Sequence, residues 1–156
     1  MGHRVCPWWL GYLLASPLRR LLQDPAAVIK PYVRGGMTVL EPGPGMGFFT
    51  VEVARTDARL APADSMGLQD LRGKVDFALA MAVVHEMPSS SRFFEEVAEA
   101  MKPGATLLLA EPSGHVKQDA FEAELQDAAA AGLEVIGRPA VPRSQAALLR
   151  KSGSQG

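Results

Sequence analysis

Apolar and polar positions along this chain change between two periodicities. Leucines recur at helical spacing within residues 8–33, which predicts one or two amphipathic helices there. The second of these is expected to begin at Pro25, with Asp24 as its N-terminal cap. Further along, short continuous apolar runs of the kind found in strands covered on both faces alternate with amphipathic stretches. This alternation predicts an α/β fold with a Rossmann-like, doubly wound and mostly parallel sheet.

The apolar runs define the individual elements. They predict strands at 37–41, 74–81 and 105–111, a further short strand at 58–61, and helices at 47–55, 89–101 and 117–131. The runs at 133–137 and 146–149 have no helix between them, which predicts an antiparallel hairpin at the end of the sheet. Charged residues of the last two helices are expected on solvated faces.

These elements divide the chain into an N-terminal helical extension and a sheet domain. The expected boundaries are 1–36 for the extension, 37–151 for the domain and 152–156 for a polar tail. A length of 156 residues suits one domain, and a hydrophobic fraction of 47% favours a packed core over disorder.

Charge and cysteine content narrow the expected setting. The net charge of −1 gives no electrostatic reason to expect a nucleic-acid partner. Cys6 is the only cysteine, so no intrachain disulfide can form and a reducing cytoplasm is expected. The apolar stretch at 8–22 is interrupted by Pro17, Arg19 and Arg20, so neither a membrane span nor a signal peptide is expected.

The strand at 37–41 leads into a loop with three glycines at alternate positions. Its residues are Glu41-Pro42-Gly43-Pro44-Gly45-Met46-Gly47. Glycines allow a sharp turn and a close backbone approach to a ligand, and the following helix offers free N–H groups to the same place. Phe48 stands where the dinucleotide-binding pattern has its third glycine, so the loop favours a nucleotide-like ligand other than NAD.

Several segments, in order, resemble the class I S-adenosylmethionine-dependent methyltransferases across residues 37–150. The segments that carry the resemblance are 39–47, 63–66, 76–80 with His85-Glu86, 93–104 and 107–112. The resemblance implies S-adenosyl-L-methionine as cofactor and S-adenosyl-L-homocysteine as product. The cofactor-binding positions it implies are Glu41, Gly43, Pro44, Gly45, Gly47, Asp64, Ser65 and Met81. Glu41 would bind the amino-acid end of the cofactor, although it could instead cap the glycine loop.

The chain departs from this family after the first helix. Only residues 56–62 separate that helix from Ala63-Asp64-Ser65, where the family has a second strand and helix. The fold is therefore expected to be reduced by about one strand–helix unit. The chain could be a minimal form, the unit could be encoded but missing from this sequence, or its loss could have abolished cofactor binding. Asp64 has the spacing of a ribose-binding acid, while the resemblance gives it an adenine contact.

Candidate catalytic and acceptor-binding residues follow the strand that ends at Met81. His85 could accept a proton from an oxygen or nitrogen nucleophile because an imidazole titrates near neutral pH. A rim position is the alternative, and methyl transfer can proceed without a base when donor and acceptor are aligned. The acceptor pocket is expected to include residues from several elements. These are Trp8, Tyr12, His85, Glu86, Glu111 and His115.

No metal site is expected, because His3 and Cys6 supply too few ligands. The leading hypothesis is therefore methyl transfer to a small-molecule acceptor, without a nucleic-acid or membrane partner. The alternative is a non-catalytic scaffold domain, in which a homodimer covers the sheet edge left by the missing unit.

Overall fold

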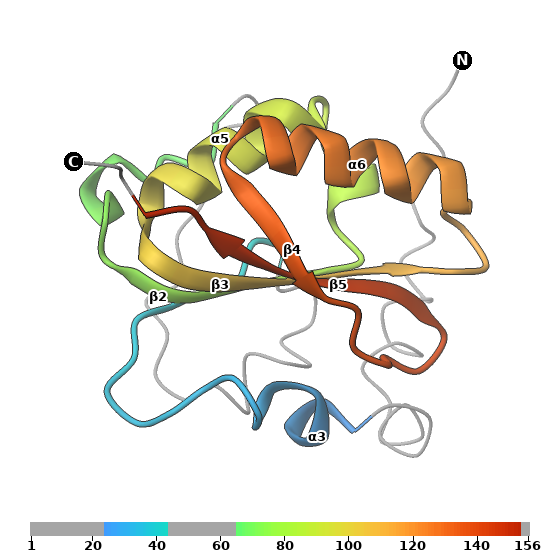
Figure 1. Cartoon of the computed structure of the whole chain (residues 1–156), viewed down its shortest axis with the longest axis horizontal. Coiled ribbons are helices and arrows are strands. Elements are labelled where there is room, and N and C mark those ends of the chain that lie inside the picture. The colour runs from blue at the N-terminus through green and yellow to red at the C-terminus, as the bar shows by residue number, and fades with distance from the viewer. Residues whose placement is uncertain (1–23, 44–64, 154–156) are drawn as a thin grey trace.

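The computed structural model describes residues 24–43 and 65–153 of the chain. Within them lies a five-stranded open sheet with the strand order β1-β2-β3-β5-β4 (Figure 1). The strands are β1 (Val39–Leu40), β2 (Val75–Met81), β3 (Met101–Pro112), β4 (Leu133–Gly137) and β5 (Ser144–Lys151). The helices are α3 (Pro25–Ile29), α5 (Ser90–Ala100) and α6 (Gln118–Ala130), with 3-10 turns η1 (Gln69–Leu71) and η2 (Val84–Glu86).

The pairing of the strands confirms the expected fold class. Strands β1, β2 and β3 are parallel neighbours, while β5 is antiparallel to both β3 and β4. The predicted C-terminal hairpin is therefore present, and its second strand lies between β3 and β4. Strand β3 begins at Met101, four residues before the predicted start, because Met101 already pairs with Val75 of β2.

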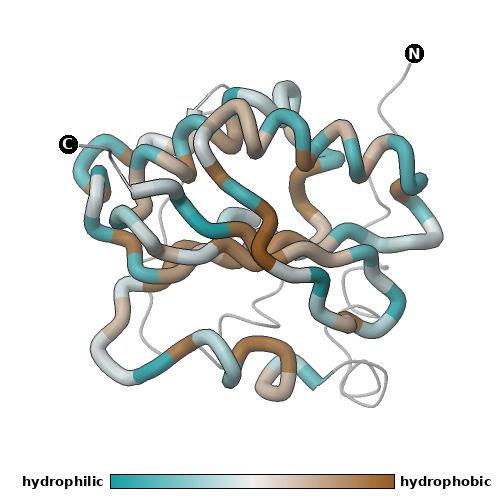
Figure 2. The backbone as a smooth tube through the Cα atoms, in the orientation of Figure 1, coloured by the Kyte–Doolittle hydropathy of each residue, from teal (hydrophilic) through white to brown (hydrophobic). Residues whose placement is uncertain are grey.

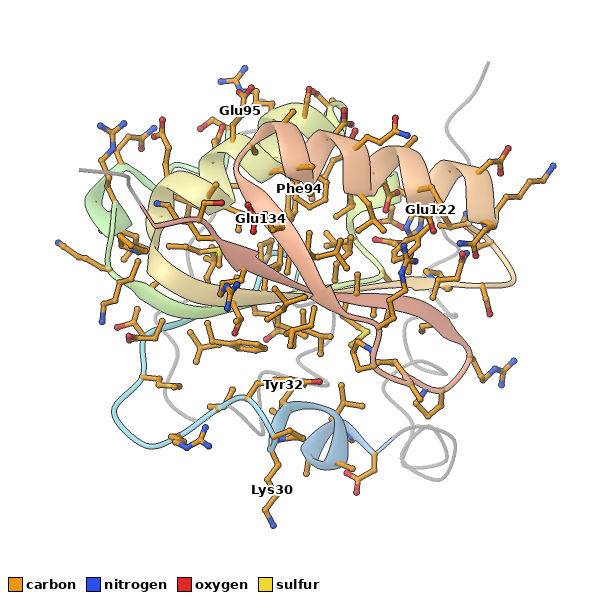
Figure 3. The ribbon with its side chains drawn as sticks, in the orientation of Figure 1. Lys30, Tyr32, Phe94, Glu95, Glu122 and Glu134 are labelled. Atoms are coloured by element: carbon orange, nitrogen blue, oxygen red, sulfur yellow. The ribbon has the colours of Figure 1, made fainter. Side chains whose placement is uncertain are left out.

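Helices cover both faces of the sheet, as a doubly wound fold requires. Helices α5 and α6 lie on one face and α3 on the other (Figure 1), with the most hydrophobic backbone running through the central strands (Figure 2). Tyr32, just after α3, stacks on Phe77 of β2 with ring centroids 5.6 Å apart. Lys30 points away from the sheet (Figure 3), so α3 buries only the side that carries Ile29.

Local sequence signals explain where these helices begin and end. The Asp24 carboxylate accepts a hydrogen bond from Ala26 N at 3.0 Å, which confirms the predicted cap of α3. Ser89 caps α5 by accepting from Arg92 N at 3.2 Å. Gly132 ends α6 with a φ of +81°, a left-handed conformation that favours glycine.

One sequence prediction about the helices is wrong. Glu96 of α5 and Glu124 of α6 are not on solvated faces: the Glu96 side chain is 20% exposed, and Glu124 is 8% exposed. Glu96 binds the segment that precedes η1, and Glu124 shares the buried face of α6 with Phe121 and Leu125. A single long side chain on an apolar face does not interrupt the helical periodicity, which is why the pattern did not reveal it.

Some predictions concern parts of the chain outside the described residues. These are the first N-terminal helix, the helix at 47–55 and the short strand at 58–61. Among the described strands, β1 lies at the edge of the sheet. Residues 44–64, which follow β1, lie outside the described ranges, so the reduction by one strand–helix unit stays a prediction. No helix in the described ranges is long and apolar enough to cross a membrane.

Candidate active site at the carboxyl edge of the sheet

The carboxyl ends of the three parallel strands bring most of the described candidate residues to one edge. Glu41 and Gly43 follow β1, Met81 ends β2, and Glu111 lies near the end of β3. Ligands of doubly wound sheets bind outside this edge. The fold therefore places these residues where the sequence analysis expected a ligand site.

The first two strand ends are in direct contact. Gly43 has a φ of +64°, and a β-carbon built on it would lie 2.5 Å from Val83 Cγ2. A glycine is thus required here on two grounds, its left-handed backbone and its packing against Val83. The glycine loop begins its path against the turn that follows β2.

The turn after β2 is itself strained. Ala82 has a φ of +55°, which is unusual for a residue with a side chain. Its N–H still donates to Ala110 O of β3 at 2.8 Å, which extends the parallel pairing of the strands. After this residue the chain leaves the sheet, and η2 begins at Val84. Strain of this kind is often retained where it serves a site.

The buried carboxylate of Glu111 organises this turn. Glu111 is fully buried, and its Oε1 accepts hydrogen bonds from Val83 N at 3.2 Å and Val84 N at 2.8 Å. Its Oε2 contacts Nδ1 of His85. Two backbone N–H groups and the His85 ring thus contact one buried carboxylate. Glu111 supports His85 from behind and does not reach the surface.

The two ring nitrogens of His85 differ, because Nδ1 contacts Glu111 and Nε2 lies on the other side of the ring. Because the carboxylate of Glu111 accepts at Nδ1, the neutral ring carries its hydrogen there and a lone pair at Nε2. Nε2 lies 4.0 Å from Oε1 of Glu86, too far for a hydrogen bond. The His85 side chain is 17% exposed, so the basic nitrogen is partly shielded from solvent. A carboxylate that fixes an imidazole in this way prepares it for proton transfer.

Two further candidates flank His85. His115, exposed in the loop after β3, meets the His85 ring edge to face with centroids 5.1 Å apart. Glu86 is exposed, with 71% of its side chain accessible. The structure thus brings His85, Glu86, Glu111 and His115 together, with Glu111 fully buried behind His85. That these residues line an acceptor pocket stays a prediction.

The predicted cofactor residues Ser65 and Met81 make their contacts with residues outside this cluster. Ser65 Oγ donates to Glu96 Oε2 of α5 at 3.2 Å and accepts from Gly67 N at 3.1 Å. The half-buried Met81 packs against the apolar residues between the sheet and α3. The Glu96 carboxylate also accepts from Met66 N at 2.7 Å, so α5 holds this segment in place.

A second buried acid was not among the sequence candidates. The carboxylate of Glu124 on α6 is repelled by Glu111 and by Asp127, and its Oε2 has no hydrogen-bond partner within the described parts of the chain. Burial, then Glu111 and Asp127, raise the pKa of Glu124 to about 7. The sequence did offer a signal, because residues 121, 125 and 128 form the buried face of α6 and Glu124 falls between them.

The remaining predicted site residues lie outside the described ranges. They are Trp8, Tyr12, Pro44, Gly45, Gly47 and Asp64. Among the described residues, the half-buried Glu41 directly follows β1 at the ligand edge of the sheet. Among the same residues, no group of three or more histidine, cysteine, aspartate or glutamate side chains could hold a metal ion.

Comparison with known proteins supports the fold. No protein-family model matches the sequence, and no curated protein is similar to it. Solved structures do match. A protein from Methanococcus maripaludis assigned as an S-adenosyl-L-methionine-dependent methyltransferase superposes with a TM-score of 0.77, at 8% identity, over 99% of each chain. A SAM-dependent methyltransferase from Aquifex aeolicus gives 0.72 at 19% identity, over 91% of this chain and 96% of its own.

A third similar structure is that of a protein named for another reaction. The cyclase SpnF superposes with a TM-score of 0.67 at 16% identity, over 83% of this chain and 80% of its own. The fold alone therefore does not decide the chemistry. The chain has the fold of the class I S-adenosylmethionine-dependent methyltransferases, the family that its ordered motifs resemble.

Proposed function

We propose that this protein transfers a methyl group from S-adenosyl-L-methionine to a small-molecule acceptor, with His85 as the general base. The observation that carries the proposal is the contact between the buried Glu111 carboxylate and Nδ1 of His85 at the ligand edge of the sheet. Glu41 and the loop that begins at Gly43 would hold the cofactor beside it, together with Asp64, Ser65 and Met81.

When bound, the cofactor supplies an electrophilic methyl group on a sulfonium. His85 Nε2 accepts the proton that the acceptor's oxygen or nitrogen loses as that atom becomes a nucleophile. Glu111 keeps the ring in the tautomer with a free Nε2, and its negative charge stabilises the imidazolium that forms. The proton then leaves from Nε2 to solvent.

Three properties support a small acceptor. The His85 side chain is only 17% exposed, so a compact group reaches Nε2 more easily than a base within a duplex does. The chain carries a net charge of −1, which does not favour a polyanion. Carboxylates at Glu86 and Glu111 add local negative charge beside the base.

The first test is cofactor binding by titration calorimetry, with thermal unfolding as a second readout. S-adenosyl-L-methionine and S-adenosyl-L-homocysteine should bind, and a hundredfold excess over Kd should stabilise the fold by about 2.7 kcal/mol. NAD serves as the control ligand and should not bind. Absence of binding by either sulfur nucleoside would refute the proposal and favour a non-catalytic domain.

The second test follows methyl transfer from tritiated cofactor to pools of small phenols, amines and carboxylic acids. Once an acceptor is found, His85→Ala should bind the cofactor as the wild type does. Its turnover should fall about 10²- to 10⁴-fold, the usual contribution of a positioned base. Full turnover by this variant would remove the base role while leaving methyl transfer intact.

A further inference from the structure

A buried acid that interacts with Glu111 has no part in the mechanism above. Glu124 is 8% exposed, and its Oε2 has no hydrogen-bond partner within the residues that the structure describes. It lies on the face of α6 that carries Phe121, Leu125 and Ala128 into the core. Burying a carboxylate without donors is costly, and protonation removes that cost. Glu124 therefore belongs to the small class of acids that are neutral over part of the physiological range.

The groups facing Glu124 make a further negative charge unfavourable. From β3 it faces Glu111, and from its own helix Asp127. Helix α5 reaches Asp127 through the neutral Ser90, whose hydroxyl donates to Asp127 Oδ2. Both of these carboxylates, Glu111 and Asp127, raise the pKa of Glu124.

Glu111 has its own donors, but two other buried acceptor atoms lack partners in the described ranges. Gln145 of β5 lies directly opposite Glu111 in the antiparallel register. Its Nε2 donates to Val116 O at 2.8 Å, while its Oε1, like Oε2 of Glu124, is a buried acceptor with no partner in the described ranges. A proton on Glu124 would turn one of these two unpaired acceptors into a donor.

We infer that Glu124 is a positioning residue that sets how readily His85 holds a proton, acting through Glu111. When Glu124 is neutral, Glu111 supplies a single negative charge to the ring of His85. When Glu124 loses its proton to solvent, a second negative charge stands behind Glu111 and favours the imidazolium form of His85. Each site exchanges its own proton with water, and the two titrations are coupled.

The inference rests on the proposed function in one respect only, the role of His85 as a catalytic base. The electrostatic coupling concerns three side chains of the free protein and needs neither cofactor nor acceptor. Loss of the methyltransferase proposal would therefore leave the coupling open to measurement. Loss of the coupling would likewise leave methyl transfer untouched.

The test is a pH titration of the histidine ring protons by NMR, in the full chain without ligand. His85→Ala and His115→Ala identify the two signals. Glu124→Gln keeps the size of the side chain and fixes it neutral. In this variant the midpoint of the His85 titration should move to lower pH by several tenths of a unit, a loss of at least about twofold in proton affinity.

Glu122→Gln is the matched control. Glu122 lies on the same helix but at its surface, where it forms an ion pair with Arg138 at 2.9 Å (Figure 3). The Glu122→Gln substitution changes the net charge by the same amount as Glu124→Gln, yet its effect on His85 should be screened by solvent. Glu124→Met provides a second neutral side chain if the glutamine variant does not fold, and it should move the midpoint in the same direction. Superimposable His85 curves for the wild type and the Glu124 variants, or an equal shift in Glu122→Gln, would overturn the inference.

Discussion

Gly43 and Val83 pack so closely that no other residue fits at position 43. A β-carbon on Gly43 would lie 2.5 Å from Val83 Cγ2 and 3.3 Å from Val83 Cβ. The contact joins the start of the glycine loop to the turn that carries His85. Two parts of the site that are 40 residues apart in the sequence are thereby fixed against each other.

Gly43→Ala should destabilise the fold through both strain and overlap. A left-handed φ costs an alanine about 1–2 kcal/mol, and overpacking adds about 1–3 kcal/mol. Gly36→Ala is the control, because Gly36 has a φ of +86° and a β-carbon placed on it would meet nothing within 4 Å. Urea unfolding should show a larger loss at Gly43, partly restored by adding Val83→Ala. Equal losses at the two glycines would mean that the contact does not constrain the loop.

Glu111→Gln should separate the role of Glu111 as a backbone acceptor from its role toward His85. The amide oxygen can still accept from Val83 N and Val84 N, so the fold and cofactor binding should persist. The amide nitrogen would then face Nδ1 of His85 and favour the tautomer with hydrogen on Nε2, which cannot act as a base. Turnover should fall at least about a hundredfold.

Glu95→Gln on the exposed side of α5 removes the same charge and is the control for this experiment. Its turnover should stay within about twofold of the wild type. The crucial readout is the difference between the two variants. If Glu111→Gln retained wild-type turnover with an intact fold, the tautomer argument would fail.

Asp76 is expected to hold β1 in register with the rest of the sheet. Its Oδ2 accepts from Thr38 N at 2.9 Å, and its Oδ1 accepts from Lys102 Nζ at 2.6 Å. Asp76→Ala should lower the free energy of unfolding by about 1–2 kcal/mol, the usual size of two lost hydrogen bonds. Lys102→Met removes only the second bond and should cost less. An equal cost for the two variants would show that the Thr38 bond contributes nothing.

The Asp76 contribution should also depend on pH. The Lys102 ammonium, followed by the Thr38 N–H, holds the pKa of Asp76 below its ordinary value of 3.8. Its stabilising effect is complete above the pKa of the unfolded chain and disappears as the pH falls through the lower folded value. The gap between the wild type and Asp76→Ala in acid titrations of stability should therefore narrow only below about pH 4.

The main sheet elements follow from local signals. The apolar run at 75–81 and the caps at Asp24 and Ser89 encode their structures within a few residues, so periodicity and capping chemistry predict them. The glycine pattern likewise predicts a ligand edge, although the reason for Gly43 is clear only once Val83 is seen against it. Such a contact depends on the packing of two strand ends.

The support for His85 could not be predicted in the same way. Glu111 lies 26 residues from His85, and the register of β2 against β3 brings them together. The sequence identified both residues but assigned Glu111 to the pocket wall, while the structure places it behind the histidine. Glu124 escaped notice because a charged residue on a helix is usually solvated, and only the depth of α6 on the sheet decides otherwise.

Stability should fall with rising pH because of Glu124, opposite in sign to Asp76. Burial first, then Glu111 and Asp127, raise its pKa from 4.5 to about 7. Between these values the folded chain holds a proton that the unfolded chain has released, so the free energy of unfolding decreases as the pH rises. The total change is at most about 3 kcal/mol. This loss of stability is absent below pH 4.5 and complete above pH 7.

Glu124→Gln should remove this dependence. At pH 8 the variant should be more stable than the wild type, whereas near pH 4 the two should be alike, as measured by urea unfolding across this range. Glu122→Gln provides a comparison of opposite sign, because Arg138 lowers the pKa of Glu122 and its contribution is lost only as the pH falls. A wild-type advantage over Glu124→Gln that grows with pH would show that the buried carboxylate has a stabilising partner when charged. In that case Glu124 would not change its protonation near neutral pH, as the coupling to His85 requires.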